Sequence, residues 1–591
     1  MRKSTFLAAA LLVAAGAYAG TPQFKWGKLI DSPQTQDLSS KVVLSSDGNY
    51  VSLSNFGSRT AADVITFDGV EIATGAATIS NSDNLNLLVI KHNAADGSLR
   101  WRVSSKFGDF LVSSYSDMTA TADGGVLVLV NGRSSSQSVY SAPILVDNSG
   151  NEVTFDNWNT SVWMQNQVLI KIDADGNIEW ARNIVMDQLP VPAASSGTSV
   201  QATTQGVMVA AVNVDAEGNI YIGGNYRAPM ILTGEKNATY IPTARNIASY
   251  NGDVQNAAGG LYVIRLDKDG NYVNHLRASG ELTRDQANLF CIDGSTLYLA
   301  GSVKGASGDK LTIVDKSITL KNTYEGFFVA SIPTTLKTIN YLVPVTAYGN
   351  KSSKNSTKLR DLKLIDGKLY IAGGGTGGYG DASSTAAQVA STGTTEEGWL
   401  IALNSADGSW AGAANNATNI GAYLSVFPYG GNIYVYGYRL NSADGSFLDE
   451  YPAGSFTRAN RYTIAKGGGA PTGYSAAFDP TTTMVVTLSR GNAAFTYGDG
   501  TTSAAPTSWG GLIAAYQFES TATSATAATA TSFTARGAEG SVVLTASAPT
   551  AVTIVNAAGQ TVASLEAPEG TTSVALPAGL YLVNGQKLTV R

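Results

Sequence analysis

A hairpin sequence that recurs along the chain restricts the fold more than any other feature. In residues 167–184, "QVLIKIDADGNIEWARNI", apolar side chains alternate on both sides of an Asp-Ala-Asp-Gly-Asn turn. Period-two alternation around such a turn is a strong short-range signal for a β-hairpin. Residues 261–276, "LYVIRLDKDGNYVNHL", repeat the pattern, so we expect a β-repeat protein.

Two hairpin types alternate strictly, and each occurs seven times. One type places a turn before an apolar strand, as in residues 121–132, "TADGGVLVLVNG", and the other resembles residues 167–184. Two hairpins give a four-stranded unit, which must stack on its neighbours to bury its faces. Radial stacking leaves only short edges exposed. The sequence therefore predicts an all-β fold, a seven-bladed β-propeller with four strands per blade, with an open solenoid or two stacked sandwiches as the competing architecture.

The two ends of the repeat region complement each other. The last repeat ends at residues 511–520, "GLIAAYQFES", without the Trp-bearing strand that follows Arg100 and Glu179 in earlier repeats. Residues 24–30, "FKWGKLI", carry Trp26 and supply a candidate for that strand. We therefore expect the N-terminal strand to complete the last blade and close the ring.

The first repeat resembles a known family. It reads "DGNYVSLSNFG" (47–57), "VITFDGVEIATG" (64–75) and "LLVIKHNAADGSLRW" (87–101). This is similar to the SBBP-type β-propeller repeats of secreted bacterial proteins, and the resemblance covers roughly residues 24 to 519. It implies a propeller on an exported protein and no one activity, because propellers include both enzymes and scaffolds.

The chain begins with a processing signal. Arg2 and Lys3 precede an apolar run over residues 6–13 and an Ala-Tyr-Ala site, which predicts a signal peptide, residues 1–19, cut between Ala19 and Gly20. The run is too short for a membrane helix, and no other segment could span a bilayer. The predicted location is therefore secreted or at the outer-membrane cell surface.

The composition changes after the propeller region, which we place at residues 20–520. Residues 521–532, "TATSATAATATS", are typical of a flexible linker. Alternating apolar residues over 533–591 predict a small immunoglobulin-like β-sandwich.

This terminal region is similar to the C-terminal sorting domains of type IX secretion cargo. The similarity rests on the hairpin "VTIVNAAGQTV" with Gly559, the strand "LPAGLYLV" with Gly579 and Tyr581, and the last strand "KLTVR" with Lys587. It implies that the export machinery is a partner. The usual Asn-Pro opening is absent, so a plain immunoglobulin-like appendage is the alternative.

The net charge argues against nucleic-acid binding, and the scarcity of cysteine and histidine argues against catalysis by these residues. The net charge of −6 and pI near 5.2 remove the basic field that nucleic-acid binding needs. Cys291 is the only cysteine and lies in an apolar strand, where it is expected to be a small buried hydrophobe rather than a nucleophile. His92 and His275 are the only histidines.

No cofactor is expected. Asp173, Asp175 and Asn177, and the matching residues of the second copy, resemble part of a calcium loop. A full loop would end in a bidentate Glu at position twelve, where Ile184 stands instead. Turn closure by Asp and Asn explains every feature, so calcium stays the minor alternative.

The aromatic residues in the expected loops and the spacing of the carboxylates favour a binding role. Trp158, Trp163, Tyr379 and Tyr429 fall in expected loops and could stack on sugar rings. The carboxylate pairs 396–397 and 449–450 are adjacent, so on a strand they would face opposite sides, whereas a glycosidase needs two that converge. We therefore expect a non-enzymatic surface module for a glycan or protein ligand. A carbohydrate-active enzyme and a structural component of a surface assembly are the alternatives.

Overall fold

The structure, a computed structural model, consists of strands and turns, with no helix in the residues that it describes. These residues are 20–33, 38–58, 63–74, 84–107, 110–111, 116–133, 143–155, 165–186, 208–226, 230–233, 239–241, 260–279, 282, 284–285, 288–348, 357–381, 383–384, 387–390, 396–415, 421–439, 445–467, 472–518, 533–547, 549–557, 560–583 and 586–591. No helix able to cross a membrane occurs in this part of the chain. The chain divides into two units, Met1–Glu519 and Ser520–Arg591, which are described separately.

Several predicted features lie outside the described residues. They are the signal peptide over residues 1–19 with Ala19, the linker over 521–532, and the residues Trp158, Trp163 and Gly559.

In its described residues the first unit contains seven antiparallel sheets, numbered here from 1 to 7 by the chain position of their first strands. Each has a core of four strands. The first strands are β2 (Leu38–Leu44), β9 (Asp117–Ala120), β15 (Met208–Val214), β22 (Leu289–Asp293), β28 (Lys358–Ile365), β34 (Gly421–Tyr429) and β38 (Thr472–Asp479). The second strands are β3 (Tyr50–Ser58), β10 (Val126–Arg133), β16 (Ile220–Tyr226), β23 (Thr296–Lys304), β29 (Lys368–Gly375), β35 (Asn432–Arg439) and β39 (Met484–Gly491).

The outer half of each sheet is built in the same way. The third strands are β6 (Asn84–His92), β13 (Gln165–Ile172), β19 (Gly260–Leu266), β26 (Gly326–Pro333), β32 (Glu397–Asn404), β36 (Ser446–Pro452) and β41 (Gly510–Phe518). The fourth strands are β7 (Leu99–Phe107), β14 (Ile178–Met186), β20 (Tyr272–Ser279), β27 (Tyr341–Tyr348), β33 (Trp410–Asn415), β37 (Asn460–Gly467) and β1 (Pro22–Asp31). Two short strands, β8 (Phe110–Leu111) and β21 (Arg284–Asp285), pair with β10 and β23.

The first strands of the seven sheets contact one another in a closed cycle. The order is β2, β9, β15, β22, β28, β34, β38 and back to β2. Seven clusters of buried apolar residues fill the spaces between neighbouring sheets; Leu129 of β10 and Ile222 of β16, for example, share one cluster. Because each sheet buries both faces against its neighbours in this cycle, the unit has a propeller-like fold.

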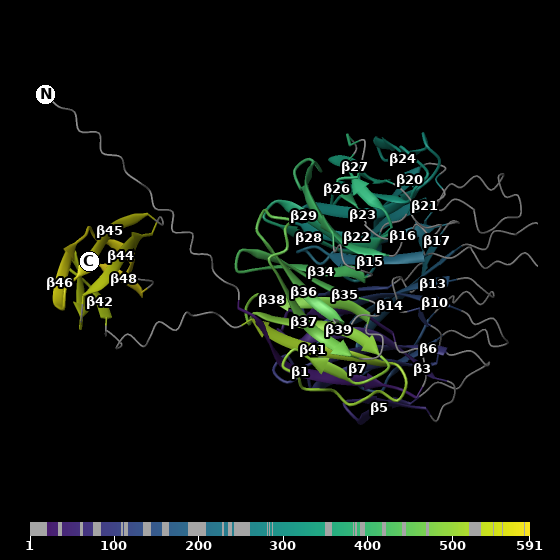
Figure 1. Ribbon diagram of the computed structural model, residues 1–591, viewed down its shortest axis with the longest axis horizontal. Coiled ribbons are helices and arrows are strands. Elements are labelled where there is room, and N and C mark those ends of the chain that lie inside the picture. Colours follow the sequence, from purple (N-terminus) through teal and green to yellow (C-terminus); the bar gives the residue numbers. More distant parts are fainter. Residues whose placement is uncertain are drawn as a thin grey trace, which may run out of the picture. The chain divides into compact units, whose positions relative to one another are not determined.

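The start and the end of the first unit meet in sheet 7. β1 pairs antiparallel with β41, with Trp26 opposite Ala515 and Leu29 opposite Leu512 (Figure 1). The predicted pairing of residues 24–30 with the last strand of the repeat region is therefore confirmed. The pairing buries Trp26 and Ile30 in the cluster between sheets 7 and 1.

Among the described residues, short insertions link six of the seven sheets, all but sheet 6, to the sheet before them. Between the second and third strands of a sheet, an inserted strand or hairpin extends the fourth strand of the preceding sheet; β4 and β5, inserted in sheet 1, extend β1 of sheet 7. These insertions are β4 (Val64–Phe67), β5 (Val70–Thr74), β11 (Ile144–Val146), β12 (Glu152–Thr154), β17 (Met230–Thr233), β18 (Thr239–Ile241), β24 (Lys310–Ile313), β25 (Lys316–Thr319), β30 (Gly378–Gly380), β31 (Val389–Ala390) and β40 (Phe495–Tyr497). These insertions therefore hold neighbouring sheets together.

The second unit contains two antiparallel sheets with a shared core. One sheet is formed by β42 (Phe533–Ala538), β43 (Ser541–Ala546) and β46 (Gly570–Ala575). The other is formed by β45 (Thr561–Ala567), β44 (Thr550–Asn556), β47 (Gly579–Val583) and β48 (Gln586–Val590). Val542 and Leu544 of the first sheet lie in one buried cluster with Ile554 and Val583 of the second.

Candidate functional site

A cavity of about 270 Å³ lies on the axis of the first unit, at the end where the first strands begin. Six of the seven sheets contribute to its wall, and every lining residue except Tyr438 belongs to a first strand or directly precedes one. The lining residues are Ser40, Lys41, Ser116, Asp117, Asn288, Leu289, Leu359, Arg360, Leu424, Tyr438, Thr472, Gly473, Tyr474 and Ser475.

The wall is shaped by β-bulges that recur at one level of the first strands. The pairing of the first with the second strand shifts at Ser40, Arg360, Leu424 and Tyr474. A bulge adds an unpaired residue to a strand and re-aims its side chain, which is why bulges are common beside binding sites. All four bulged residues line the cavity.

Polar side chains at this level join neighbouring first strands. The carboxylate of Asp117 accepts a hydrogen bond of 3.0 Å from the backbone N–H of Val212 in β15. Asp361 accepts one of 2.8 Å from the N–H of Val426 in β34. The hydroxyl of Ser425 accepts one of 2.9 Å from Ala476 in β38. These bonds satisfy backbone N–H groups of the neighbouring first strand, and so they join the strands beside the cavity.

One ion pair lies in the wall. The Lys41 ammonium is 3.0 Å from a carboxylate oxygen of Asp117, the only acidic side chain among the described lining residues. Burial disfavours the charged ammonium, but Asp117 and, more weakly, Asp361 outweigh it and raise the pKa of Lys41 above its ordinary value. Asp117 is therefore already balanced by a cation.

Two arginines beside the cavity each have one nitrogen that no described residue bonds. The Nε of Arg360 and the Nε of Arg490 are buried and have no hydrogen-bond partner among the described residues. Arg490 stacks on aromatic rings, with its guanidinium carbon 5.9 Å from the ring centre of Tyr474 and 4.8 Å from that of Trp509. The site thus combines aromatic rings with two guanidinium Nε groups that lack an acceptor among the described residues.

The tyrosines of the site are held in a poorly hydrated environment. Burial raises the pKa of Tyr474 to about 12, and the charges of Arg490 and Arg360 partly offset that rise. Burial and the charge of Glu396 also raise the pKa of Tyr438, and the same two arginines partly offset that rise. Both phenols are therefore neutral hydrogen-bonding groups at physiological pH.

Of the predicted stacking residues, the two that the structure describes, Tyr379 and Tyr429, do not line this cavity. Tyr379 lies in β30 rather than in a loop and is buried, with its ring centre 5.1 Å from that of Trp399 and 6.0 Å from that of Phe327. Its ring faces are covered by protein, which leaves none exposed for a sugar. Tyr429 ends β34 and packs on Phe518 at 4.6 Å between ring centres.

The two turns that resemble part of a calcium loop are closed by their own side chains. Asp173 accepts hydrogen bonds from the backbone N–H groups of Asp175 and Asn177 and from the Asn177 amide. Asp267 makes the same three contacts in its own turn. In the described part of the chain, no three His, Cys, Asp or Glu side chains are grouped to hold a metal ion.

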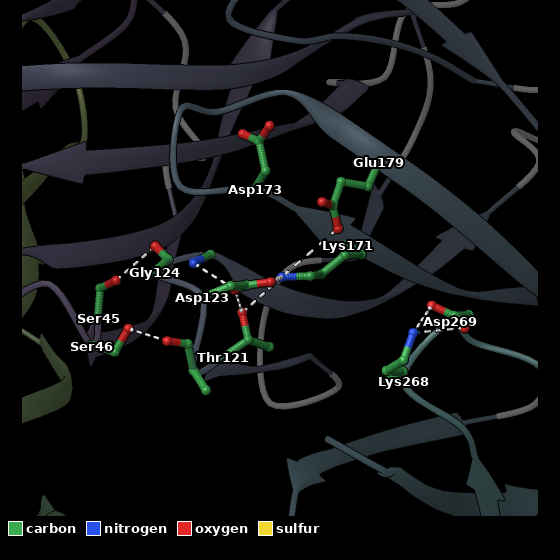
Figure 2. Close-up of polar contacts among 12 residues, drawn as sticks. Ser45, Ser46, Thr121, Asp123, Gly124, Lys171, Asp173, Glu179, Lys268 and Asp269 are labelled. Carbon is green, nitrogen blue, oxygen red and sulfur yellow. Dashed lines mark hydrogen bonds and ion pairs between the residues drawn. The ribbon is translucent and has the colours of Figure 1, made fainter. Parts of the chain in front are cut away.

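The turns at the ends of the first strands carry a separate polar network, shown in Figure 2. The Lys171 ammonium of β13 is directed at Asp123, 2.7 Å from a carboxylate oxygen, and also contacts the Thr121 hydroxyl at 2.8 Å. Ser45 of sheet 1 donates a hydrogen bond of 2.8 Å to the Gly124 carbonyl of sheet 2. These polar groups are hydrogen-bonded to one another, and the bond from Ser45 to Gly124 joins sheets 1 and 2.

The two adjacent carboxylate pairs separate as expected for strand residues. Asp449 of β36 forms two hydrogen bonds of 2.6 Å with Arg461, whereas Glu450 accepts hydrogen bonds from Tyr462 and Asn460. Glu396 pairs with Lys358 at 2.6 Å, and Glu397 is buried at the start of β32.

Cys291 and the two histidines lie apart from the cavity wall. Cys291 is half-buried in β22 against the cluster between sheets 4 and 5, and burial raises the pKa of its thiol. His92 is fully buried and bonds the Ser52 hydroxyl at 2.7 Å. The Nδ1 of His275 lies 2.8 Å from the Tyr272 hydroxyl.

The described residues of the sorting-domain resemblance lie on two neighbouring strands. Gly579 and Tyr581 belong to β47, and Lys587 belongs to β48, where it pairs with Leu582. Tyr581 is buried and donates a hydrogen bond of 3.0 Å to the Pro577 carbonyl, whereas Lys587 is exposed.

No sequence motif marks the wall residues Lys41, Asp117, Arg360 and Tyr474 or the neighbouring Arg490. One signal was present. Four residues before the end of their strands, "KLRDLKLI", "GAYLSVFPY" and "TGYSAAFD" all place Asp or Ser where an innermost strand would be expected to be apolar. These residues follow the bulges that line the cavity.

Comparisons with known proteins give distant likeness only. No family model matches the chain, and no curated protein matches it. A solved Dos1 propeller structure is 8% identical, with a TM-score of 0.34, over 84% of this chain and 96% of that one. PorZ, described as a surface component of the type IX secretion system of Porphyromonas gingivalis, is 10% identical, with a TM-score of 0.24, over 94% and 82%. A europium-containing methanol dehydrogenase is also 10% identical, with a TM-score of 0.32, over 79% and 89%.

Proposed function

We propose that the chain is an exported, non-enzymatic binding module that takes a glycan or protein ligand at its axial cavity. In this proposal residues 20–520 are a seven-bladed β-propeller. The closed cycle of first strands and the β1–β41 pairing support that architecture.

The observation that carries the binding role is the composition of the cavity wall. Six sheets bring polar side chains, two tyrosines and Arg360 to one place. A glycosidase would need two carboxylates across the scissile bond. Among the described lining residues Asp117 is the only carboxylate, and Lys41 already pairs with it. The wall therefore suits ligand recognition better than hydrolysis.

The second unit is proposed to direct export. Residues 533–591 would form an immunoglobulin-like sandwich, which the shared core of the two sheets supports. Removal of residues 533–591 in a bacterium with type IX secretion should retain the protein in the periplasm. Equal surface exposure with and without these residues would contradict the export role.

A ligand screen tests the binding role. Residues 20–591 are screened against glycans and surface proteins beside Tyr474→Ala, with Trp158→Ala and Trp163→Ala as the variants that the sequence suggested. We expect a ligand whose binding Tyr474→Ala abolishes. Ligands that bind equally to the wild type and to Tyr474→Ala, or no ligand at all, would contradict a cavity site.

A further inference from the structure

We propose that the axial cavity is specific for a carboxylated sugar, such as a uronic acid residue. This inference rests on the proposed binding function and names the ligand class of that site. The sugar carboxylate would be held by Arg360 and Arg490, and the sugar ring would lie against Tyr474.

The charge of the site favours an acidic ligand. Two guanidinium groups lie beside the cavity, and the buried Nε of each has no hydrogen-bond partner among the described residues. The guanidinium is planar, is always charged and presents paired N–H donors that match a carboxylate. The nearest lysine in the wall, Lys41, is already neutralised by Asp117 at 3.0 Å. An incoming anion would therefore bond to the arginine side chains rather than to the Lys41 ammonium.

The environment of the two arginines also favours an acidic ligand. Both act electrostatically on Tyr438 and Tyr474, which line the cavity, and Glu396 also acts on Tyr438. The buried Nε of each arginine has no hydrogen-bond acceptor among the described residues, which is unfavourable until a ligand supplies one. A carboxylate offers two acceptor oxygens to a guanidinium at once, whereas a neutral sugar does not.

The size and polarity of the cavity suit a single sugar ring. Small-molecule sites usually enclose roughly 300 to 1,000 Å³, and this cavity of about 270 Å³ is near the lower limit, which suits one sugar ring. Hydroxyl and amide groups of Ser40, Ser116, Asn288 and Thr472 line it and can bond sugar hydroxyls. The aromatic face of Tyr474 suits the apolar face of the ring.

Calorimetry on residues 20–591 tests the inference with D-glucuronate and D-galacturonate, against D-glucose, D-galactose and propionate. The uronates should bind, and the neutral sugars and propionate should bind about tenfold or more weakly. A galacturonate oligomer is tested beside the monomer: tighter oligomer binding identifies a polysaccharide end as the source, and tighter monomer binding identifies a free sugar. Binding should weaken as salt is added.

Variants locate the site. Arg360→Ala and Arg490→Ala should each weaken uronate binding by about tenfold or more. Arg360→Lys, which keeps the charge without the paired donors, should give a smaller loss. Arg277→Ala, an exposed arginine of β20, is the matched control and should change nothing. Thermal unfolding of each variant checks that it is folded.

The outcomes separate this inference from the proposed function. Equal binding of uronates and neutral sugars, or uronate binding unchanged in both arginine variants, would overturn the acidic specificity. If Tyr474→Ala still abolished binding of another ligand in that case, the binding function would stand without it. If Tyr474→Ala changed the binding of no ligand, both the acidic specificity and the proposed binding function would be contradicted.

Discussion

The indole Nε1 of Trp26 donates a hydrogen bond of 2.9 Å to the carbonyl of Ala94, which joins the fourth strand of sheet 7 to a turn of sheet 1. Trp101 of sheet 1 makes the same bond, at 2.8 Å, to Ala174 of sheet 2. A strand from the start of the chain therefore uses the contact that joins two sheets in the interior of the sequence.

Loss of the Trp26 contact should destabilise the first unit. Trp26→Ala removes a buried indole and should lower the free energy of unfolding by about 3–5 kcal/mol, whereas Trp26→Phe loses mainly the hydrogen bond, worth about 1 kcal/mol. Urea unfolding followed by fluorescence measures both. Trp101→Ala is the matched variant and should give a loss of similar size. A much smaller effect at Trp26 would mean that sheet 7 is not closed by β1.

Gly176 should tolerate alanine less well than Gly150. Both have positive φ, +87° and +85°, so backbone strain is the same in the two variants. A Cβ on Gly176 would lie 2.7 Å from the Trp101 ring, whereas a Cβ on Gly150 meets nothing within 4 Å. Gly176→Ala should cost about 1–3 kcal/mol more, because the Trp101 ring must move. Equal costs in urea unfolding would contradict the packing of Trp101 on this turn.

Arg461 should be essential for the stability of sheet 6. Asp449 has no exposed surface and is held by two hydrogen bonds of 2.6 Å from Arg461. Arg461→Ala leaves the buried Asp449 charge with only the Tyr423 hydroxyl at 2.6 Å and the more distant Arg458 at 3.6 Å, and should cost about 3–5 kcal/mol. Lys268→Ala, which breaks the exposed pair with Asp269, should leave the urea midpoint unchanged. A stable Arg461→Ala variant would show that Asp449 is not buried as described.

His92 should make folding less favourable in acid. Burial lowers its pKa to about 3 from the ordinary value of 6.5. The unfolded chain therefore binds a proton between these two values while the folded chain does not, so the stability is fully present above pH 6.5 and is lost as the pH falls toward 3. The loss at about pH 4 is on the order of 3 kcal/mol.

The His92→Gln variant isolates this effect. Glutamine can still bond the Ser52 hydroxyl but does not titrate near neutral pH. The difference in unfolding free energy between wild type and variant should therefore shrink from neutral pH to about pH 4. A difference that stays constant over this range would contradict a buried neutral histidine.

The sequence predicts the strands better than it predicts the site, for a physical reason. Alternation and Asp-Gly turns are local signals, so the hairpins at residues 167–184 and 261–276 and the role of Trp26 could be read directly. The cavity depends on contacts between sheets. Arg360 and Tyr474 reach it because bulges shift their strands, and bulges leave no reliable local pattern.

Exposure was also hard to infer from the sequence. Tyr379 follows a glycine-rich stretch that is typical of a loop, but it forms β30 and packs on Trp399 because the insertion pairs with the preceding sheet. That pairing joins residues far apart in the sequence, so the local sequence of the glycine-rich stretch does not predict it.

A disulfide between β1 and β41 tests the central claim most directly. Gln23 and Gln517 are register partners, so Gln23→Cys/Gln517→Cys in a Cys291→Ala background places two thiols within bonding reach. Thiol titration and non-reducing electrophoresis should show complete intramolecular oxidation of the folded protein, with far less for Lys25→Cys/Gln517→Cys. Free thiols, or disulfides formed only between molecules, would contradict a ring of sheets closed by the start of the chain.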